Sequence, residues 1–152
     1  MDKIGSEFIV KGGTKDAIDL KSKKIIGIYF SAHWCPPCRA FTPNLAKAYK
    51  AMKEAGNDIE IIFATFDQSE EEFKSYFADM PWIAFPHGDK RIKENSDEYG
   101  VSGIPCLVIL KDGVLLTKDG RMDVAQENEG AYAKWIKWSI LYSNLHIFLN
   151  TP

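Results

Sequence analysis

The sequence predicts an α/β fold in which a central mixed β-sheet is flanked by helices within a single domain. Three observations lead to this prediction. Short apolar runs alternate with segments of helical periodicity, two later apolar runs are separated by a tight turn, and no linker or repeat divides the 152 residues. A chain of this length fits one domain and can bury a core without disulfide bonds.

The first half of the chain predicts a β-α-β unit. Residues 25–30 are continuously apolar, as expected for a strand that is covered on both faces. Residues 39–55 read as a helix that ends before Gly56, and residues 59–66 predict a second apolar strand. Two strands joined through a helix should be parallel, with a right-handed crossover.

The second half predicts two further helices, a hairpin and a closing helix. Ser69 and Glu72 have the spacing of a capping box at the start of one helix, and residues 90–99 predict a weaker one. Residues 106–110 and 114–117 predict the two strands of a hairpin. A stripe at helical spacing predicts that the core face of the closing helix consists of Ala131, Trp135, Trp138, Leu141, Tyr142, Leu145 and Phe148.

Composition and charge exclude several classes of protein. With 19 basic and 21 acidic residues, the chain lacks the basic excess that nucleic-acid binding requires. No run approaches the ~20 apolar residues of a membrane span, and the N-terminus lacks the apolar core of a signal peptide. Three cysteines are too few for a disulfide scaffold. We therefore expect a cytoplasmic or nucleocytoplasmic protein without membrane or nucleic-acid partners.

The most informative segment lies where the first predicted strand ends and the first helix begins. Cys35 and Cys38 are separated there by Pro36 and Pro37, a spacing that brings two sulfurs within bridging distance. The partial positive charge of a helix N-terminus stabilises a thiolate, and proline suits the first turn of a helix. A C-x-x-C pair beside a β-α-β pattern predicts thiol–disulfide exchange, in which one sulfur attacks a disulfide and the other resolves the mixed disulfide.

Other interpretations of the pair are weaker. A zinc site needs four ligands, and only Cys106 and three histidines remain, so no metal is expected. An inert structural pair is disfavoured because the motif lies at an exposed turn. Thiol–disulfide exchange needs no organic cofactor, and none is expected. Trp34, beside the motif, is either a core residue or, as we favour, an apolar rim that shields the nucleophile.

The string Trp34-Cys35-Pro36-Pro37-Cys38-Arg39 resembles the thioredoxin superfamily. Residues 29–43 resemble its tryparedoxin and nucleoredoxin branch, where WCPPCR replaces the WCGPC of ordinary thioredoxins. The resemblance continues at residues 67–72, 80–82 and 99–105, and covers about residues 18–120. It implies a thioredoxin fold, with residues 1–152 as one domain and a core from about residue 18 to residue 149.

The resemblance also implies roles for individual residues. Cys35 would be the nucleophile and Cys38 the resolving thiol, and the two would form the redox disulfide. The backbone of Ile104, in a cis-proline loop, would pair with an extended substrate. Pro43 matches a proline that bends the first helix. The implied substrate-binding surface consists of Trp34, Pro36, Pro37, Ile104 and Pro105.

Two residues depart from the pattern of ordinary thioredoxins. Tyr29 stands where those proteins have a buried acid that is thought to help move the proton of the resolving thiol, so the proton acceptor for Cys38 is unidentified. Water or the leaving thiolate could serve. Cys106 is either a small buried hydrophobe that starts a strand, as we favour, or a third redox thiol near the pair.

Polar residues near the motif are expected to have minor roles. His33 is expected to be an exposed loop side chain, with thiolate stabilisation by its protonated form as the alternative. Arg39 could assist Cys35 or bind an acidic partner, or be merely solvated. Asp67 and residues 70–72 are expected to be helix-cap charges rather than metal ligands.

The predicted function is reduction of protein disulfides by dithiol–disulfide exchange. By resemblance, the substrates would be protein disulfides, including that of a peroxiredoxin-type peroxidase. An upstream reductase or a low-molecular-weight dithiol would restore the cysteine pair. The alternative is a redox-sensing interaction module that uses the same disulfide as a switch. A monomer is expected rather than a dimer, although aromatic residues of the closing helix could face a second subunit.

Overall fold

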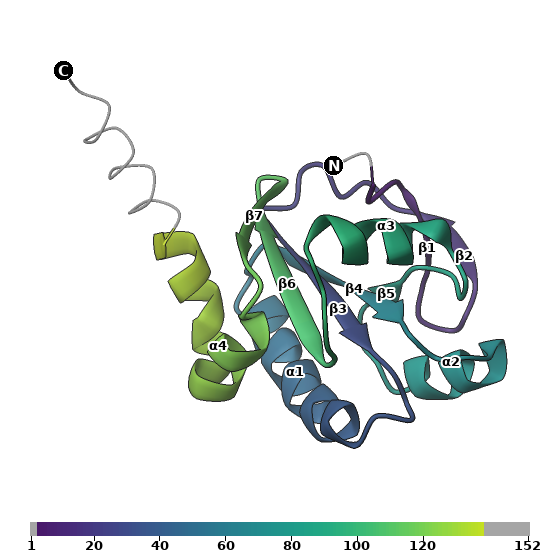
Figure 1. The fold of residues 1–152 in the computed structure, drawn as a ribbon. Helices are drawn as coiled ribbons and strands as arrows, with labels where there is room; N and C mark the ends of the chain where they lie inside the picture. Colours follow the sequence, from purple (N-terminus) through teal and green to yellow (C-terminus); the bar gives the residue numbers. More distant parts are fainter. Residues whose placement is uncertain (1–2, 139–152) are drawn as a thin grey trace.

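A seven-stranded mixed sheet forms the centre of the molecule (Figure 1). The computed structural model describes residues 3–138 of the chain. The strands follow the order β2-β1-β5-β4-β3-β6-β7 across the sheet. Along the chain they are β1 (Glu7–Ile9), β2 (Lys15–Ala17), β3 (Ile25–Ser31), β4 (Ile59–Thr65), β5 (Ile83–Ala84), β6 (Cys106–Lys111) and β7 (Val114–Thr117).

The middle of the sheet contains the parallel strand pair and the hairpin that the sequence predicts, joined by the pairing of β3 with β6. β3 pairs in parallel with β4 and antiparallel with β6, and β6 continues into an antiparallel hairpin with β7. Every residue of β3 is buried. Ile25 and Tyr29 pack into the core on one face of the sheet, and Ile26 and Phe30 pack into the core on the other. Burial on both faces is the reason why this strand is continuously apolar.

Helices cover both faces of the sheet. They include α1 (Pro36–Glu54), α2 (Glu70–Phe77), α3 (Lys90–Glu98), α4 (Gly120–Glu127) and the short 3-10 turn η1 (Asn128–Gly130). Side chains of α1, α2 and α4 share one core cluster, whereas Ile92 of α3 belongs to the other. Figure 1 shows α1 and α3 on opposite faces. Within residues 3–138, none of the helices combines the length and apolar character that a membrane crossing requires.

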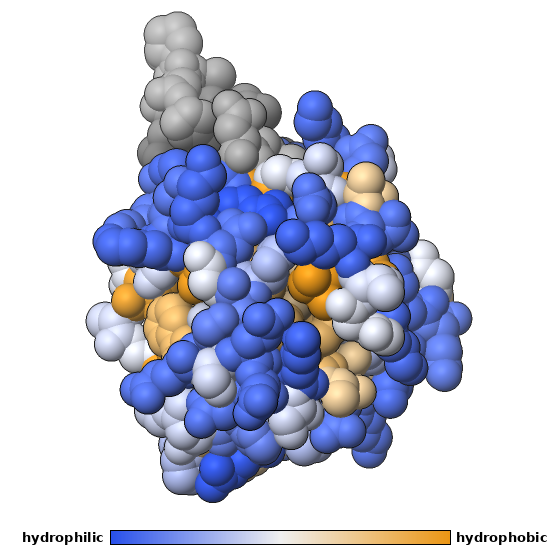
Figure 2. Space-filling model, turned by 90° about the vertical axis from the view of Figure 1, so that its right-hand side faces the viewer, coloured by the Kyte–Doolittle hydropathy of each residue, from blue (hydrophilic) through white to orange (hydrophobic). Residues whose placement is uncertain are grey.

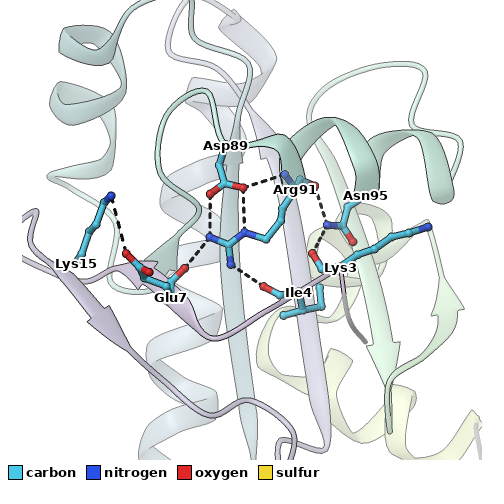
Figure 3. A network of polar contacts seen from close by, with 7 residues as sticks. All are labelled: Lys3, Ile4, Glu7, Lys15, Asp89, Arg91 and Asn95. Carbon is cyan, nitrogen blue, oxygen red and sulfur yellow. Dashed lines mark hydrogen bonds and ion pairs between the residues drawn. The ribbon is translucent and has the colours of Figure 1, made fainter.

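The packed core also includes residues that precede position 18. Ile4 and Phe8 are buried, and β1 joins the sheet by pairing with β2 and β5. Strands of two or three residues are too short for a periodic pattern, so the sequence does not reveal them. Arg91 of α3 holds this segment in place, because its guanidinium donates hydrogen bonds to the carbonyls of Ile4 (2.8 Å) and Glu7 (2.7 Å) (Figure 3).

The closing helix is described as far as residue 138. Ala131 and Trp135 are fully buried, as predicted. Trp138 was expected on the same face, but 46% of it is exposed, and Lys134 Nζ lies 5.3 Å from the centre of its ring. The prediction is wrong for Trp138 because the last described helical turn lies beyond the sheet edge at β7 (Figure 1). The rest of the predicted stripe, Leu141, Tyr142, Leu145 and Phe148, lies outside the described residues.

Apolar surface is sparse on the face of the molecule that Figure 2 shows, where small hydrophobic patches are separated by hydrophilic side chains. The large hydrophobic residues exposed within residues 3–138 are Trp34, Val114, Leu115, Met122 and Trp138. Trp34 is the member of this group that adjoins the cysteine motif.

Candidate active site

The cysteine motif lies at the junction of β3 and α1. Cys35 is the N-cap residue of α1, and its sulfur accepts a hydrogen bond from the backbone N–H of Cys38 at 3.4 Å. Pro36 and Pro37 occupy the first two helical positions and are exposed. Proline is tolerated there because the first N–H groups of a helix have no partner within the helix. The partial positive charge of the helix N-terminus is therefore directed at the sulfur of Cys35.

The two thiols have different surroundings. Both are free thiols. Cys35 is 5% exposed, whereas Cys38 is fully buried. Burial raises the pKa of Cys38 to about 11, and its hydrogen bond with Cys35 acts in the same direction. The hydroxyl of Ser31 and the backbone of Ala32 oppose this shift of the pKa. Cys38 is therefore a protonated thiol at neutral pH.

The loop before β6 lies against the motif. The peptide bond between Ile104 and Pro105 is cis, and the carbonyl oxygen of Ile104 lies 3.9 Å from the sulfur of Cys35. Ile104 also packs against the small buried cluster that contains Ala32, Cys35 and Cys38. The fold thus brings together two segments that are separated by more than sixty residues in the sequence.

Trp34 lies on the surface beside the pair. Its side chain is 53% exposed, and its indole Nε1 donates a hydrogen bond to the carbonyl of Phe66 at 3.3 Å. The ring therefore lies on the surface and does not belong to the core, which excludes the first of the two interpretations.

Asp67 orders the turn that precedes Trp34. It is buried, and its carboxylate accepts hydrogen bonds from the backbone N–H of His33 and from the hydroxyl of Thr65, each at 2.8 Å. The expectation of a helix-cap charge is therefore wrong for Asp67, because its partners lie on the neighbouring turn and strand. In α2 the N-cap is Ser69, with residues 70–72 in the first turn, as expected.

His33 is also less exposed than the sequence predicts. Its ring stacks on the ring of Tyr76, with 5.1 Å between the centroids and 10° between the planes. Arg39 donates a hydrogen bond to the carbonyl of His33 at 2.8 Å. The expectation of an exposed loop side chain is wrong for His33, which is half-buried because α2 supplies an aromatic partner that the sequence does not place there.

A cluster of four buried hydroxyl groups lies behind Cys38 and is formed by Tyr29, Ser31, Thr42 and Tyr76. The hydroxyl oxygens are 2.8 Å apart for Tyr29 and Thr42, 2.6 Å for Thr42 and Tyr76, and 2.8 Å for Ser31 and Tyr76. Thr42 also donates to the carbonyl of Cys38 at 2.9 Å. Burial raises the pKa of both tyrosines, so both stay protonated. Sequence reasoning identified only Tyr29, from its position relative to the motif.

Cys106 begins β6 and is partly buried. Its sulfur lies 3.9 Å from the carbonyl oxygen of Lys118. Burial raises its pKa, against the charge of Lys118, which lowers it. This environment fits a small side chain at the start of a strand better than a reactive thiol. Across residues 3–138, no group of three or more His, Cys, Asp or Glu side chains is placed to hold a metal ion.

The arrangement of a C-x-x-C pair, a cis-proline loop and a mixed sheet has counterparts among known proteins. Residues 23–114 match the family model described as thioredoxin-like. The chain belongs to the thioredoxin-like family. This family of oxidoreductases has the thioredoxin fold, so the predicted fold is confirmed.

The relatives come from the branch that the sequence motif indicates. Nucleoredoxin from Mus musculus is 45% identical over 112 residues, which are 72% of this chain and 26% of the nucleoredoxin. The solved structure of tryparedoxin II from C. fasciculata is 36% identical, with a TM-score of 0.77 over 83% of this chain and 88% of that chain. A structure of tryparedoxin II complexed with glutathionylspermidine is 37% identical, with a TM-score of 0.76 over 83% and 89% of the two chains. The chain spans about a quarter of the length of the mouse nucleoredoxin.

Proposed function

We propose that this protein is a thiol–disulfide oxidoreductase that reduces protein disulfides through Cys35 and Cys38. The observation that carries the proposal is the position of Cys35 as the N-cap of α1, with the N–H of Cys38 on its sulfur and the cis-proline loop beside it. A sulfur in this position is stabilised as a thiolate, which is the form that attacks disulfides.

The proposed reaction has two exchange steps. First, the Cys35 thiolate attacks one sulfur of the substrate disulfide, a new S–S bond forms, and the other substrate sulfur leaves as a thiolate. Second, Cys38 loses its proton and attacks the sulfur of Cys35, which releases the second substrate thiolate. The substrate gains two electrons, and the protein is left with a Cys35–Cys38 disulfide that a reductant must open.

The proposed substrate surface surrounds the sulfur of Cys35. Trp34, Pro36 and Pro37 are exposed around it, and Ile104 borders it from the other side. An extended protein segment could lie across this surface and pair with the backbone at residue 104, with Pro105 beneath it. Partners of this kind include a peroxiredoxin-type peroxidase.

The reductant is proposed to be an upstream reductase or a low-molecular-weight dithiol. The complex of tryparedoxin II with glutathionylspermidine supports the second possibility. Such a pair would be kept reduced in a compartment with the redox poise of the cytosol.

The proposal is tested by insulin-disulfide reduction with dithiothreitol as the reductant. Wild type is expected to reduce insulin well above the dithiothreitol background, and Cys35→Ser is expected to lose this rate. Cys38→Ser should accumulate a mixed disulfide on Cys35, visible by mass spectrometry. Cys106→Ser is the matched control and should keep the wild-type rate. A folded wild-type protein with no rate above background would refute the reductase.

A redox-sensing interaction module is the second candidate function. The burial of Cys38 favours it, because a thiol with a pKa of about 11 is ionised to only a small fraction at neutral pH, so a mixed disulfide on Cys35 would be resolved slowly. In this case the insulin rate would stay at background while a partner protein remained covalently bound to wild type. If partner binding and phenotype are unchanged when both Cys35 and Cys38 are replaced by serine, a redox switch is excluded.

A further inference from the structure

The number of hydroxyl hydrogens limits the directions that the hydrogen bonds behind Cys38 can take. Each hydroxyl has one hydrogen to donate and two lone pairs to accept with. Thr42 uses its hydrogen on the carbonyl of Cys38, which can only accept. While Thr42 donates to that carbonyl, Tyr29 and Tyr76 donate to Thr42, and Ser31 donates to Tyr76. In this arrangement Ser31 gives no hydrogen to the sulfur of Cys38, and the hydrogen of the Cys38 thiol is directed at Cys35.

A second arrangement of the same four hydroxyl groups also gives every hydroxyl hydrogen an acceptor. In this arrangement Ser31 turns its hydrogen toward the sulfur of Cys38, and Tyr76 donates to Ser31. Thr42 then donates to Tyr76 instead of to the carbonyl of Cys38. Tyr29 still donates to Thr42, so every hydroxyl hydrogen keeps a partner. Rotation of three C–O bonds converts one arrangement into the other, with no movement of the heavy atoms. The first arrangement suits a thiol at Cys38, and the second suits a thiolate.

We infer that the hydroxyl chain from Ser31 through Tyr76 to Thr42 reverses its direction when Cys38 ionises and then donates a hydrogen bond to the Cys38 thiolate. This inference rests on the proposed function, in which Cys38 attacks the mixed disulfide. Ser31 and Tyr76 are positioning residues for this step. The chain gains and loses no proton overall: the proton of Cys38 passes to the departing substrate thiolate or to water, and the hydroxyls only reorient.

The surroundings of the chain favour this role. Tyr29 and Ser31 are fully buried, and Thr42 and Tyr76 are each 7% exposed. The His33 ring lies flat on Tyr76 and helps to separate it from solvent. Water therefore has little access to the sulfur of Cys38, and a hydrogen bond to an ion in such a site is stronger than one between neutral groups.

The experiment separates the two exchange steps in a single reaction. Reduced protein is mixed with dithiobis(nitrobenzoate), which releases one coloured thiolate when Cys35 attacks and a second when Cys38 resolves the mixed disulfide. All proteins carry Cys106→Ser, so that only the pair reacts. The two phases are followed by stopped-flow absorbance between about pH 7 and about pH 9, where the thiolate fraction of Cys38 rises with pH.

Ser31→Ala and Tyr76→Phe are expected to slow the second phase about tenfold, because a hydrogen bond to a charged group is lost. The first phase should be unchanged. The pH profile of the second phase should move to higher pH by about one unit. Thr42→Ser keeps the hydroxyl and should resolve at the wild-type rate. Tyr49→Phe is the matched control, since Tyr49 is a buried tyrosine whose hydroxyl binds Glu60 instead of the chain. Both of its phases should match wild type.

Three results would overturn the inference. Second phases that coincide in wild type, Ser31→Ala and Tyr76→Phe would show that the hydroxyls do not act on Cys38. Equal slowing of both phases would assign the hydroxyls to the local fold alone. Release of a single thiolate by wild type would instead refute the dithiol mechanism of the proposed function, and this inference with it.

Discussion

At the scale of single residues, the two sulfurs of the motif differ in what surrounds them. Cys35 is placed at the helix N-terminus, where it accepts an N–H hydrogen bond, whereas Cys38 faces the core and the hydroxyl chain. The buried thiol favours its neutral form, which is the less reactive one. The proposed division of roles between an attacking and a resolving sulfur is based on this difference.

The buried thiol makes stability depend on pH. The pKa of Cys38 rises from 9.0 to about 11 on folding, so its contribution to stability is complete below pH 9 and is lost as the pH rises toward 11. We expect the difference in unfolding free energy between reduced wild type and Cys38→Ala to shrink by about 2 kcal/mol between about pH 8 and about pH 11. Urea denaturation under reducing conditions measures this difference. Because the same buried tyrosines are present in both proteins, the effect of their raised pKa values on stability cancels in the difference. A difference that is constant with pH would contradict the prediction.

We expect Trp34 to contribute contact area for protein substrates rather than stability. Because half of it is exposed, Trp34→Ala should change the unfolding free energy by less than about 0.5 kcal/mol. Loss of an aromatic contact should lower kcat/KM for insulin about fivefold. The rate with dithiobis(nitrobenzoate), which is too small to span the rim, should stay close to wild type. An equal loss with both substrates would contradict a role in binding protein segments.

At the scale of elements, the packing of α4 on β6 depends on the absence of a side chain at Gly120. A Cβ atom at this position would lie 2.7 Å from the carbonyl oxygen of Leu107 and 2.9 Å from Cγ1 of Ile109. Such contacts force the helix away from the strand that follows the cis-proline loop.

Gly120→Ala should therefore cost about 1–3 kcal/mol of unfolding free energy, measured by urea denaturation. Gly130→Ala provides the control, because the nearest atom to its added Cβ is Cβ of Glu127 at 3.7 Å. The control should be neutral or slightly stabilising. Equal effects of the two substitutions would mean that α4 shifts freely on β6.

At the scale of the whole molecule, one side chain connects the N-terminal segment to the rest of the fold. The guanidinium of Arg91 bonds two carbonyls of the N-terminal segment and the carboxylate of Asp89 (Figure 3). It also lies over the rings of Phe8 and Phe85. Its hydrogen bond lowers the pKa of Asp89. Arg91 thus supplies hydrogen-bond partners to two carbonyls of the N-terminal segment and to the carboxylate of Asp89.

Arg91→Ala is expected to lower the unfolding free energy by about 2–3 kcal/mol, because these groups lose their partner. The rate of backbone hydrogen exchange should increase more in β1 than in β3. Lys93→Ala, which removes an exposed ion pair with Asp97 on the same helix, should leave the unfolding midpoint unchanged. Unchanged exchange in β1 of the Arg91 variant would show that pairing with β2 and β5 suffices to hold this strand.

The sequence by itself determined the centre of the fold and the reactive pair. β3, α1, β4 and the β6–β7 hairpin could be predicted because their apolar patterns and end signals are local. The cysteines and prolines of the motif act within one turn of helix, so their spacing is enough to predict the chemistry.

Only the tertiary structure decided which distant side chains complete the site. Tyr76 meets Ser31 and Thr42 from a third element, and Asp67 binds the turn at His33. Contacts of this kind depend on how helices and strands pack, and no periodicity along the chain encodes them. The same reason applies to the short strands β1, β2 and β5, which exist because the sheet edge offers them partners.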